Sequence, residues 1–298
     1  MPSPHSPVGS AAMEKPASRF SGLTLLEKRV ATGAAMAVGM GAAALWLPSA
    51  ALAGVLLVII LLGAWEWTRL TGILRRDLRI WYLAALAGSA YLVWRLFDEG
   101  WSLAPIVAGA LWWLVALMIL AVYQPGATRG PASTVGLRCA GLFALVPAWI
   151  AMIELHRLAP RPGWLLFLLL LVWVADSAAY FAGKRFGRTP LAPLISPAKT
   201  REGLYGALVA NGVLAAGGAW WFAVPSALWV YFVGLCLITT LLSVAGDLFE
   251  SLLKRRTGVK DSGRMLPGHG GVLDRIDSVV AAAPPFVLGL HWMHPRLA

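Results

Sequence analysis

The chain has 298 residues, of which 59% are hydrophobic and only 13% are charged, and its formal net charge is +11. With a mean hydropathy of +0.72, it has more apolar surface than a soluble domain of this size can bury, so lipid must solvate part of it. This excludes a soluble globular fold. The strand alternation of a membrane barrel is also absent from the sequence, which leaves helices as the spanning elements.

Nine apolar segments approach the length of about 20 residues that a membrane-spanning helix requires. They cover residues 31–47, 49–65, 80–97, 103–122, 136–155, 164–183, 204–223, 226–246 and 273–292. The pattern predicts an all-α, polytopic bundle with about nine transmembrane helices. We expect a disordered cytoplasmic tail over residues 1–29, scaffold helices over 30–160 and a catalytic region over 161–298.

The distribution of basic residues predicts the orientation of the bundle. If the N-terminus lies in the cytoplasm, 21 of the 25 Lys and Arg residues fall on the cytoplasmic side of the nine segments. Cytoplasmic loops of membrane proteins carry this excess of positive charge. The net charge is therefore explained by topology, and we expect no nucleic-acid partner.

Two acidic residues at or within apolar segments, Glu66 and Asp176, are interpreted differently. Glu66, at the inner end of the second segment, has the position of an interfacial charge beside Arg69. Asp176 lies seven residues before Gly183, which places it about 10 Å below the cytoplasmic end of its helix. A charge at such depth costs about 3 kcal/mol and usually serves a function. We therefore expect Asp176 and Tyr180 to line a polar cavity, with a helix-packing hydrogen bond as the alternative.

A basic loop follows the sixth segment and contains the tract SPAKT. Ser196, Lys199 and Thr200 place two hydroxyls and an ammonium within five residues. Such a cluster suits phosphate oxygens. A loop that is basic only for topological reasons remains the alternative, but it does not explain the two hydroxyls beside the lysine.

The richest stretch runs from Ser243 to Asp277 and holds five of the chain's 14 acidic residues. If the eighth helix continues past residue 246, Asp247, Glu250, Ser251 and Lys254 share one face at its cytoplasmic end. Two carboxylates one turn apart repel each other unless a cation compensates them. Either Lys254 or a metal ion can supply that positive charge.

A glycine-rich tract, KDSGRMLPGHGG, breaks the helix and leads into the ninth segment. His269 stands among glycines that let the backbone approach a bulky ligand. Asp274 and Asp277 then share one face of the next helix, while Arg275 points elsewhere. Two helix ends thus bring carboxylates together where phosphates can bind, which favours magnesium and phosphoryl or nucleotidyl transfer. A solvated loop with salt bridges is the alternative.

The tract SLLKRRTGVKDSGRMLPGHGGVLDRID resembles the signature of the phosphatidate cytidylyltransferase (CDP-diacylglycerol synthase) family at every specified position. The similarity extends over about residues 172–280. It implies an integral membrane enzyme that joins CTP to phosphatidic acid, releases pyrophosphate and requires a divalent cation. It also implies a homodimer in a bacterial-type inner membrane with the site facing the cytoplasm. Arg201 departs from the Trp that relatives often carry there, which puts that contact in doubt.

The residues that we expect to form the site fall into three groups. The expected catalytic residues are Asp247, Asp274, Lys254, Lys260 and Asp261. The expected substrate-binding residues are Asp176, Tyr180, Ser196, Lys199, Thr200, Glu250, Ser251, His269, Gly270, Gly271 and Arg275. The expected metal ligands, implied by the resemblance, are Asp247 and Asp274 with Asp277 close by. Mg²⁺ is the expected cofactor, with a second cation such as K⁺ as an open question.

Two other functions remain as alternatives. A CTP-dependent lipid or polyprenol kinase shares much of the catalytic apparatus but releases CDP in place of pyrophosphate. An ion-coupled transporter can use intramembrane carboxylates as its coupling path. The sequence lacks the paired broken helices that are typical of inverted-repeat transporters, which counts against the transporter.

Overall fold

The computed structural model describes residues 25–98, 103–123, 134–158, 163–263, 265 and 270–293. Over these residues the chain forms nine α-helices and a two-stranded antiparallel sheet. The helices are α1 (Leu25–Trp46), α2 (Ser49–Leu70), α3 (Arg76–Asp98), α4 (Leu103–Ala121), α5 (Thr134–Arg157), α6 (Gly163–Phe186), α7 (Arg201–Trp221), α8 (Trp229–Arg256) and α9 (Leu273–Met293). A short 3-10 turn, Ser226–Leu228, precedes α8.

Each helix overlaps one of the nine predicted segments, so the all-α fold is confirmed. Six of the helices are long and apolar enough to cross a membrane: α2, α4, α5, α6, α8 and α9. The chain is therefore a polytopic helical membrane protein. The part of α1 with described side chains, Gly33–Trp46, is a shorter apolar helix, and α1 starts at Leu25, inside the predicted tail.

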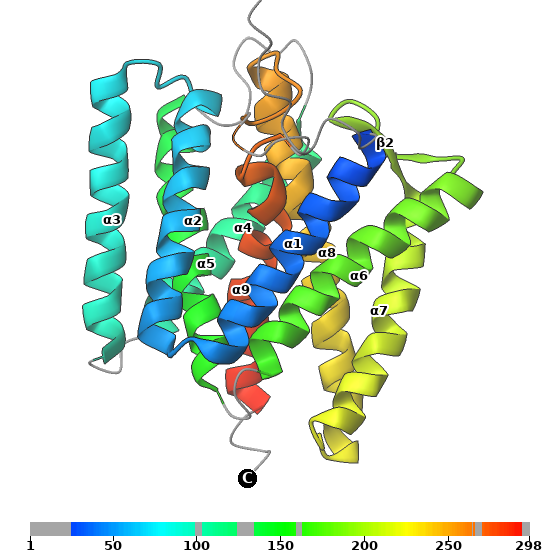
Figure 1. The fold of residues 1–298 in the computed structure, drawn as a ribbon. Coiled ribbons are helices and arrows are strands. Elements are labelled where there is room, and N and C mark those ends of the chain that lie inside the picture. Colours follow the sequence, from blue (N-terminus) through cyan, green and yellow to red (C-terminus); the bar gives the residue numbers. More distant parts are fainter. Residues whose placement is uncertain are drawn as a thin grey trace, which may run out of the picture.

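Helix α9 occupies the middle of the bundle, between α3 at one edge and α7 at the other (Figure 1). It packs against α8, α5, α4, α6 and α2. Its central residues Ala281, Ala282 and Ala283 are fully buried. Small side chains let neighbouring helix backbones approach closely, which is how membrane helices pack without a hydrophobic driving force.

One buried amide joins three helices of the C-terminal half. Asn211 of α7 is fully buried, and its Nδ2 donates to the carbonyl of Leu171 in α6 (2.9 Å) and to the hydroxyl of Thr240 in α8 (2.7 Å). The Thr240 hydroxyl in turn donates to the carbonyl of Cys236. Buried polar groups stabilise a structure only when they find partners, so this amide fixes the register of α7 against α6 and α8.

The loop after α6 contains two strands that the sequence analysis did not predict. Strand β1 (Pro190–Ala192) pairs with β2 (Ser196–Thr200) in an antiparallel hairpin. The hairpin lies at the same end of the bundle as the C-terminal end of α8 (Figure 1), and Arg255 of α8 donates from Nε to the carbonyl of Ile195 at 3.0 Å. This contact holds the hairpin against the end of α8.

Candidate active site

Strand β2 carries the predicted phosphate-binding residues Ser196, Lys199 and Thr200. Thr200 also ends the strand and caps α7, because its hydroxyl oxygen accepts from the Gly203 N–H at 3.1 Å. This is a usual role of threonine at the N-cap, the residue just before the first helical residue. Lys199 precedes the cap directly, so its position is fixed by the start of α7.

Glu202, in the first turn of α7, anchors the other side of the hairpin. Its Oε2 accepts from the backbone N–H groups of Arg188 (3.1 Å) and Thr189 (3.2 Å). These hydrogen bonds favour the ionised form and lower the pKa of Glu202 to about 2. The carboxylate thereby holds the segment before β1 against the helix that follows β2.

Helix α8 presents Asp247 toward the hairpin, where the carboxylate forms an ion pair with the Lys199 ammonium. One residue earlier, Gly246 allows α9 to come very close. A Cβ at Gly246 would lie 2.4 Å from the carbonyl oxygen of Asp277 and 2.7 Å from the Cβ of Ala281. Because Gly246 has no side chain, the backbones of α8 and α9 come close here, and the side chains of Asp247 and Asp277 lie near each other.

The side chains of Asp247, Glu250 and Asp277 form an acidic cluster, with one oxygen of each within 4.8 Å of the others. The carboxyl groups of Asp176, Asp247 and Asp277 interact electrostatically with one another and with Lys199. Three converging carboxylates supply the hard oxygen ligands that Mg²⁺ prefers. The residues of the acidic cluster thus fit a divalent cation, and two of them, Asp247 and Asp277, were predicted ligands.

Lys254 compensates one carboxylate of α8 and one of α9. Its Nζ forms ion pairs with Glu250, one turn earlier on α8, and with Asp274 of α9 at 2.6 Å. All three side chains are largely buried, with exposed fractions of 13%, 3% and 6%. Either Lys254 or a metal was expected to offset Asp247 and Glu250; in this structure Lys254 pairs with Glu250, whereas Asp247 pairs with Lys199.

The second oxygen of Asp274 organises the glycine-rich loop. Asp274 Oδ2 accepts from the backbone N–H of Gly271 at 2.8 Å and from that of Ser262 at 3.1 Å. The carboxylate therefore links the backbone at Ser262 to the backbone at Gly271. In this structure Asp274 is engaged by three donors, one ammonium and two amides.

The remaining predicted residues lie around this centre. The hydroxyl of Ser251 is 3.4 Å from Asp247 Oδ1, and Gly270, at φ +82°, would place a Cβ 2.9 Å from Asp274 Oδ2. Tyr180, 61% exposed, lies beside Lys184. The side chains of Lys260, Asp261 and Arg275 are exposed. His269 lies outside the described residues.

Glu66 is not the interfacial charge that the sequence suggested. It is 3% exposed, and its Oε2 accepts from the hydroxyl of Ser262 at 3.0 Å and from the backbone N–H of Leu273 at 2.8 Å. The contact of Glu66 with Ser262, in the segment between α8 and α9, was not predicted from the sequence. The only available signal was an acidic residue directly after an apolar segment, and an interfacial charge beside Arg69 explained it equally well.

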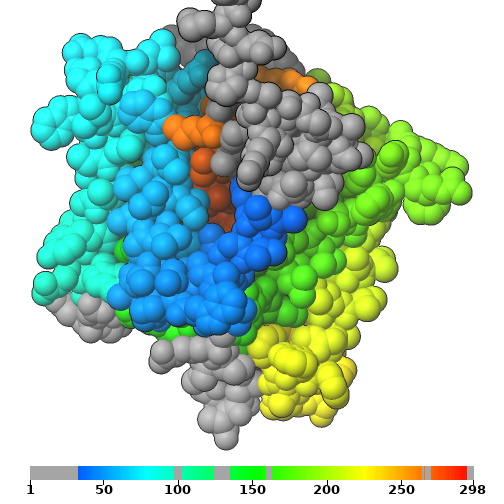
Figure 2. All heavy atoms as spheres, in the orientation of Figure 1, coloured from blue at the N-terminus to red at the C-terminus, as the bar shows by residue number. Residues whose placement is uncertain are grey.

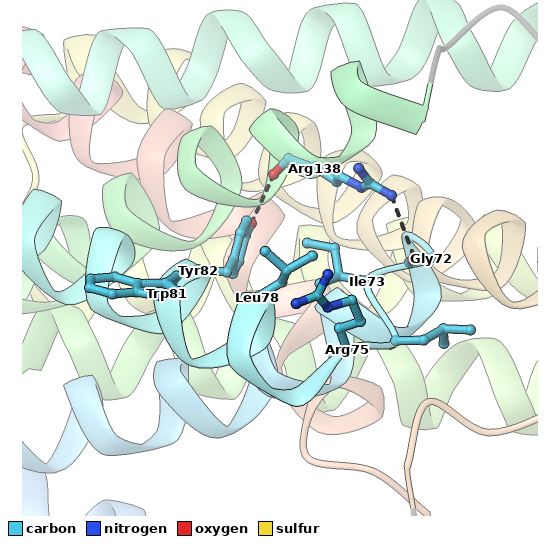
Figure 3. A pocket seen from close by; sticks show the side chains of 8 residues that line it. Gly72, Ile73, Arg75, Leu78, Trp81, Tyr82 and Arg138 are labelled. Atoms are coloured by element: carbon cyan, nitrogen blue, oxygen red, sulfur yellow. Dashed lines mark hydrogen bonds between the residues drawn. The ribbon is translucent and has the colours of Figure 1, made fainter.

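A pocket of about 520 Å³ lies elsewhere, at the turn between α2 and α3 (Figure 3). Tyr82 donates to the carbonyl of Arg138, and Arg138 donates from Nη2 to the carbonyl of Gly72. No predicted site residue lines this pocket. In the space-filling view, by contrast, orange and red atoms of the C-terminal part of the chain are visible between the atoms of α1 and α2 (Figure 2).

Fold and site together define a helical membrane protein with a site of carboxylate and ammonium groups at one end of the bundle. The model of the cytidylyltransferase family matches residues 27–293. The chain belongs to the cytidylyltransferase family, and the resemblance noted in its sequence is confirmed.

Three relatives named phosphatidate cytidylyltransferase are similar over most of the chain. The protein from Pseudomonas aeruginosa is 38% identical over 237 residues, which cover 76% of this chain and 83% of the relative. The one from Haemophilus influenzae is 35% identical over 252 residues, covering 76% and 85%. The one from Brucella suis is 38% identical over 274 residues, covering 87% and 90%.

Proposed function

We propose that this protein is a phosphatidate cytidylyltransferase, which converts CTP and phosphatidic acid to CDP-diacylglycerol and pyrophosphate. Membership of the family and the names of the relatives support this reaction. The observation that carries the proposal is the acidic cluster of Asp247, Glu250 and Asp277 beside the ammonium groups of Lys199 and Lys254. Such a site combines ligands for a cation with positive charge for phosphate oxygens.

The reaction needs no nucleophile from the protein. A phosphate oxygen of the lipid attacks the α-phosphorus of CTP, a new phosphorus–oxygen bond forms, and the bond to the β-phosphate breaks with its electron pair leaving on pyrophosphate. The protein contributes by positioning the two substrates and by stabilising negative charge. Lys199, at the end of β2, and Lys254, on α8, are the ammonium groups that the fold fixes nearest the acidic cluster.

The acidic cluster is the proposed binding site for Mg²⁺. Asp247 and Asp277 would hold the ion as expected from the sequence, and Glu250 joins them through its place in the cluster. Asp274 stays a proposed ligand that would exchange its contact with Lys254 for the ion. When bound, Mg²⁺ neutralises phosphate charge and orients the triphosphate. A second cation such as K⁺ remains part of the proposal.

The other expected residues are proposed to bind the substrates. Ser196 and Thr200 on β2 supply hydroxyls beside Lys199, and Asp176 and Tyr180 on α6 line the path of the lipid headgroup. The proposed contacts in and after α8 are Glu250, Ser251, Lys260, Asp261, His269, Gly270, Gly271 and Arg275. Because only the headgroup has to reach the site, the two acyl chains can stay in the bilayer.

We further propose that the site faces the cytoplasm of a bacterial-type cell and that the protein is a homodimer. The positive-inside distribution of Lys and Arg supports the orientation, and the bacterial origin of the relatives supports the inner membrane. The dimer rests on the resemblance to the family alone. Native mass spectrometry from detergent tests it.

The function is tested with purified protein in nanodiscs supplied with CTP, phosphatidic acid and Mg²⁺. We expect CDP-diacylglycerol and pyrophosphate in equal amounts, with loss of both after chelation of divalent cations. Release of CDP with a phosphorylated lipid alcohol would contradict the proposal and identify a kinase. Ion flux in sealed proteoliposomes without CTP, and no liponucleotide, would identify a transporter.

A further inference from the structure

Glu66 of α2 lies in the scaffold half of the chain, yet its contacts are to the glycine-rich loop and the start of α9. Its partners, Ser262 and Leu273, are 196 and 207 residues away in the sequence. Glu66 is 3% exposed and Ser262 is 1% exposed. A buried carboxyl is costly unless it is well hydrogen-bonded, so this contact has to serve either packing or the site.

The contact to Leu273 is a helix cap supplied by a distant segment. Leu273 is the first residue of α9, and its N–H is one of the four that have no partner within the helix. A carboxyl group at this end is also favoured by the helix dipole. Glu66 therefore fixes where α9 begins, one residue before Asp274.

The contact to Ser262 fixes the other end of the same loop. The Ser262 hydroxyl donates to Glu66, while the Ser262 backbone N–H donates to Asp274 Oδ2 at 3.1 Å. One residue is thus held by both carboxyl groups. A displacement of Ser262 or of the first turn of α9 would move Asp274, and with it the ion pair to Lys254.

Two glycines of the loop have their backbones pressed against the Glu66 carboxyl. A Cβ at Gly263 would lie 1.9 Å from Glu66 Oε1, and a Cβ at Gly271 would lie 2.4 Å from Glu66 Oε2 and 2.0 Å from the Ser262 hydroxyl. A side chain at either place would have to displace the Glu66 carboxyl. Glu66 Oε1 is buried without a hydrogen-bond partner among the described residues, so the hydrogen bonds of this carboxyl are all made through Oε2.

We infer that Glu66 is a positioning residue for the proposed catalytic centre, acting through Ser262 and the first turn of α9 on Asp274. It is not a catalytic residue, because its contacts are to the protein. The inference rests on the proposed site at Asp274 and deepens it. It assigns the N-terminal half of the chain a direct part in shaping that site.

The first test compares Glu66→Ala and Glu66→Gln with Glu154→Ala as a control. Glu154 is a similarly buried glutamate of the scaffold helix α5 that contacts α9 at its other end, through His291 at 2.8 Å. Loss of a group that orients metal ligands typically costs 10- to 100-fold in metal affinity or activity. We expect Glu66→Ala to lower kcat about tenfold or more and to raise the Mg²⁺ concentration for half-maximal rate, with the KM for CTP changed less.

Rescue and control sharpen this result. Glu66→Gln keeps a carbonyl oxygen that can accept from Ser262 or Leu273, so it should recover part of the lost rate. Glu154→Ala should leave the Mg²⁺ requirement unchanged. An equal shift of that requirement in Glu154→Ala, or a folded Glu66→Ala protein with normal kcat and normal Mg²⁺ requirement, overturns the inference.

The second test needs no activity and uses a double-mutant cycle in thermal unfolding. Gly263→Ala should lower the melting temperature because its Cβ meets the Glu66 carboxyl, and it should lower it much less in a Glu66→Ala background. Additive effects overturn the inferred contact. If Asp274→Asn is inactive while the Glu66 tests fail, the proposed function stands and only the role of Glu66 is lost.

Discussion

Lys199 on β2 and Asp247 on α8 form an ion pair that joins the hairpin to the acidic cluster. The same Asp247 carboxylate is a proposed cation ligand with Glu250 and Asp277. In this structure the Lys199 ammonium therefore contacts a carboxylate that would also bind Mg²⁺. Binding of the cation and of a phosphate group would separate the pair, leaving Lys199 for the phosphate and Asp247 for the ion.

Replacing Lys199 with methionine is expected to separate these two roles. Without the competing ammonium, Mn²⁺ should bind about fivefold more tightly in the absence of nucleotide, since a partly exposed ion pair contributes about 1 kcal/mol. CDP-diacylglycerol formation should fall, because the phosphate loses its partner. Mn²⁺ titration followed by electron paramagnetic resonance measures the first effect. Lys199→Arg, which keeps the charge, serves as the control, and unchanged Mn²⁺ affinity in Lys199→Met would contradict the competition.

Asp274→Asn is expected to abolish turnover while leaving the protein folded and inserted. The change removes a negative charge next to Lys254 and an acceptor for two loop amides but little volume. We expect a loss of about 100-fold or more in CDP-diacylglycerol formation, as for other residues that order a metal site. Asp77→Asn, at an exposed ion pair with Arg75, is the matched control. Near-normal turnover of Asp274→Asn at saturating Mg²⁺ would remove Asp274 from the site.

Lys254→Met is expected to destabilise the protein as well as inactivate it. Removing one partner of a buried ion pair costs about 3 kcal/mol, because the remaining carboxylates lose their compensating charge. The expected result is a clear fall in the melting temperature of the detergent-solubilised protein. Adding Glu250→Gln should restore part of that stability without restoring activity. If the single variant melts like the parent protein, the buried ion pairs of Lys254 do not carry this stability.

Glu202→Ala is expected to loosen the segment before β1. At neutral pH the backbone amides of Arg188 and Thr189 should exchange hydrogen severalfold faster than in the parent protein. Because the pKa of Glu202 is lowered from 4.5 to about 2, its stabilising effect is present above the ordinary pKa and is lost as the pH falls toward 2. Mass-spectrometric hydrogen exchange of the 186–190 region between pH 7 and pH 5 should therefore show a constant difference, and a difference that vanishes by pH 5 would contradict this pKa.

The sequence predicted the helices well because each apolar segment is long enough to define a helix by itself. It also predicted that carboxylates of α8 and α9 belong to one site, since helical spacing places Asp247 and Glu250 on one face and Asp274 and Asp277 on another. Spacing within a helix does not predict which carboxylates pair with a lysine and which join the acidic cluster. That choice depends on how close α8 and α9 come, and Gly246 sets this distance through backbone contacts with α9.

Two features had no local signal in the sequence. The β1–β2 hairpin is short and rich in proline, and it is held by contacts to Arg255 and Asp247 rather than by strand propensity. The role of Glu66 depends on partners about 200 residues away. Tertiary contacts of this kind are invisible to periodicity, which reports only on neighbours along one helix.

The bond between Glu66 and the first turn of α9 also constrains how the protein is made. The ribosome delivers α2 to the membrane long before it synthesises Leu273, so the Glu66 carboxyl waits without its final partners while seven more helices emerge. A truncated chain that lacks α9 leaves this carboxyl without its partner Leu273, and a buried carboxyl without such a partner is costly. Insertion of α9 is thus the step that gives the Glu66 carboxyl its partner at Leu273 and sets the start of that helix beside Asp274.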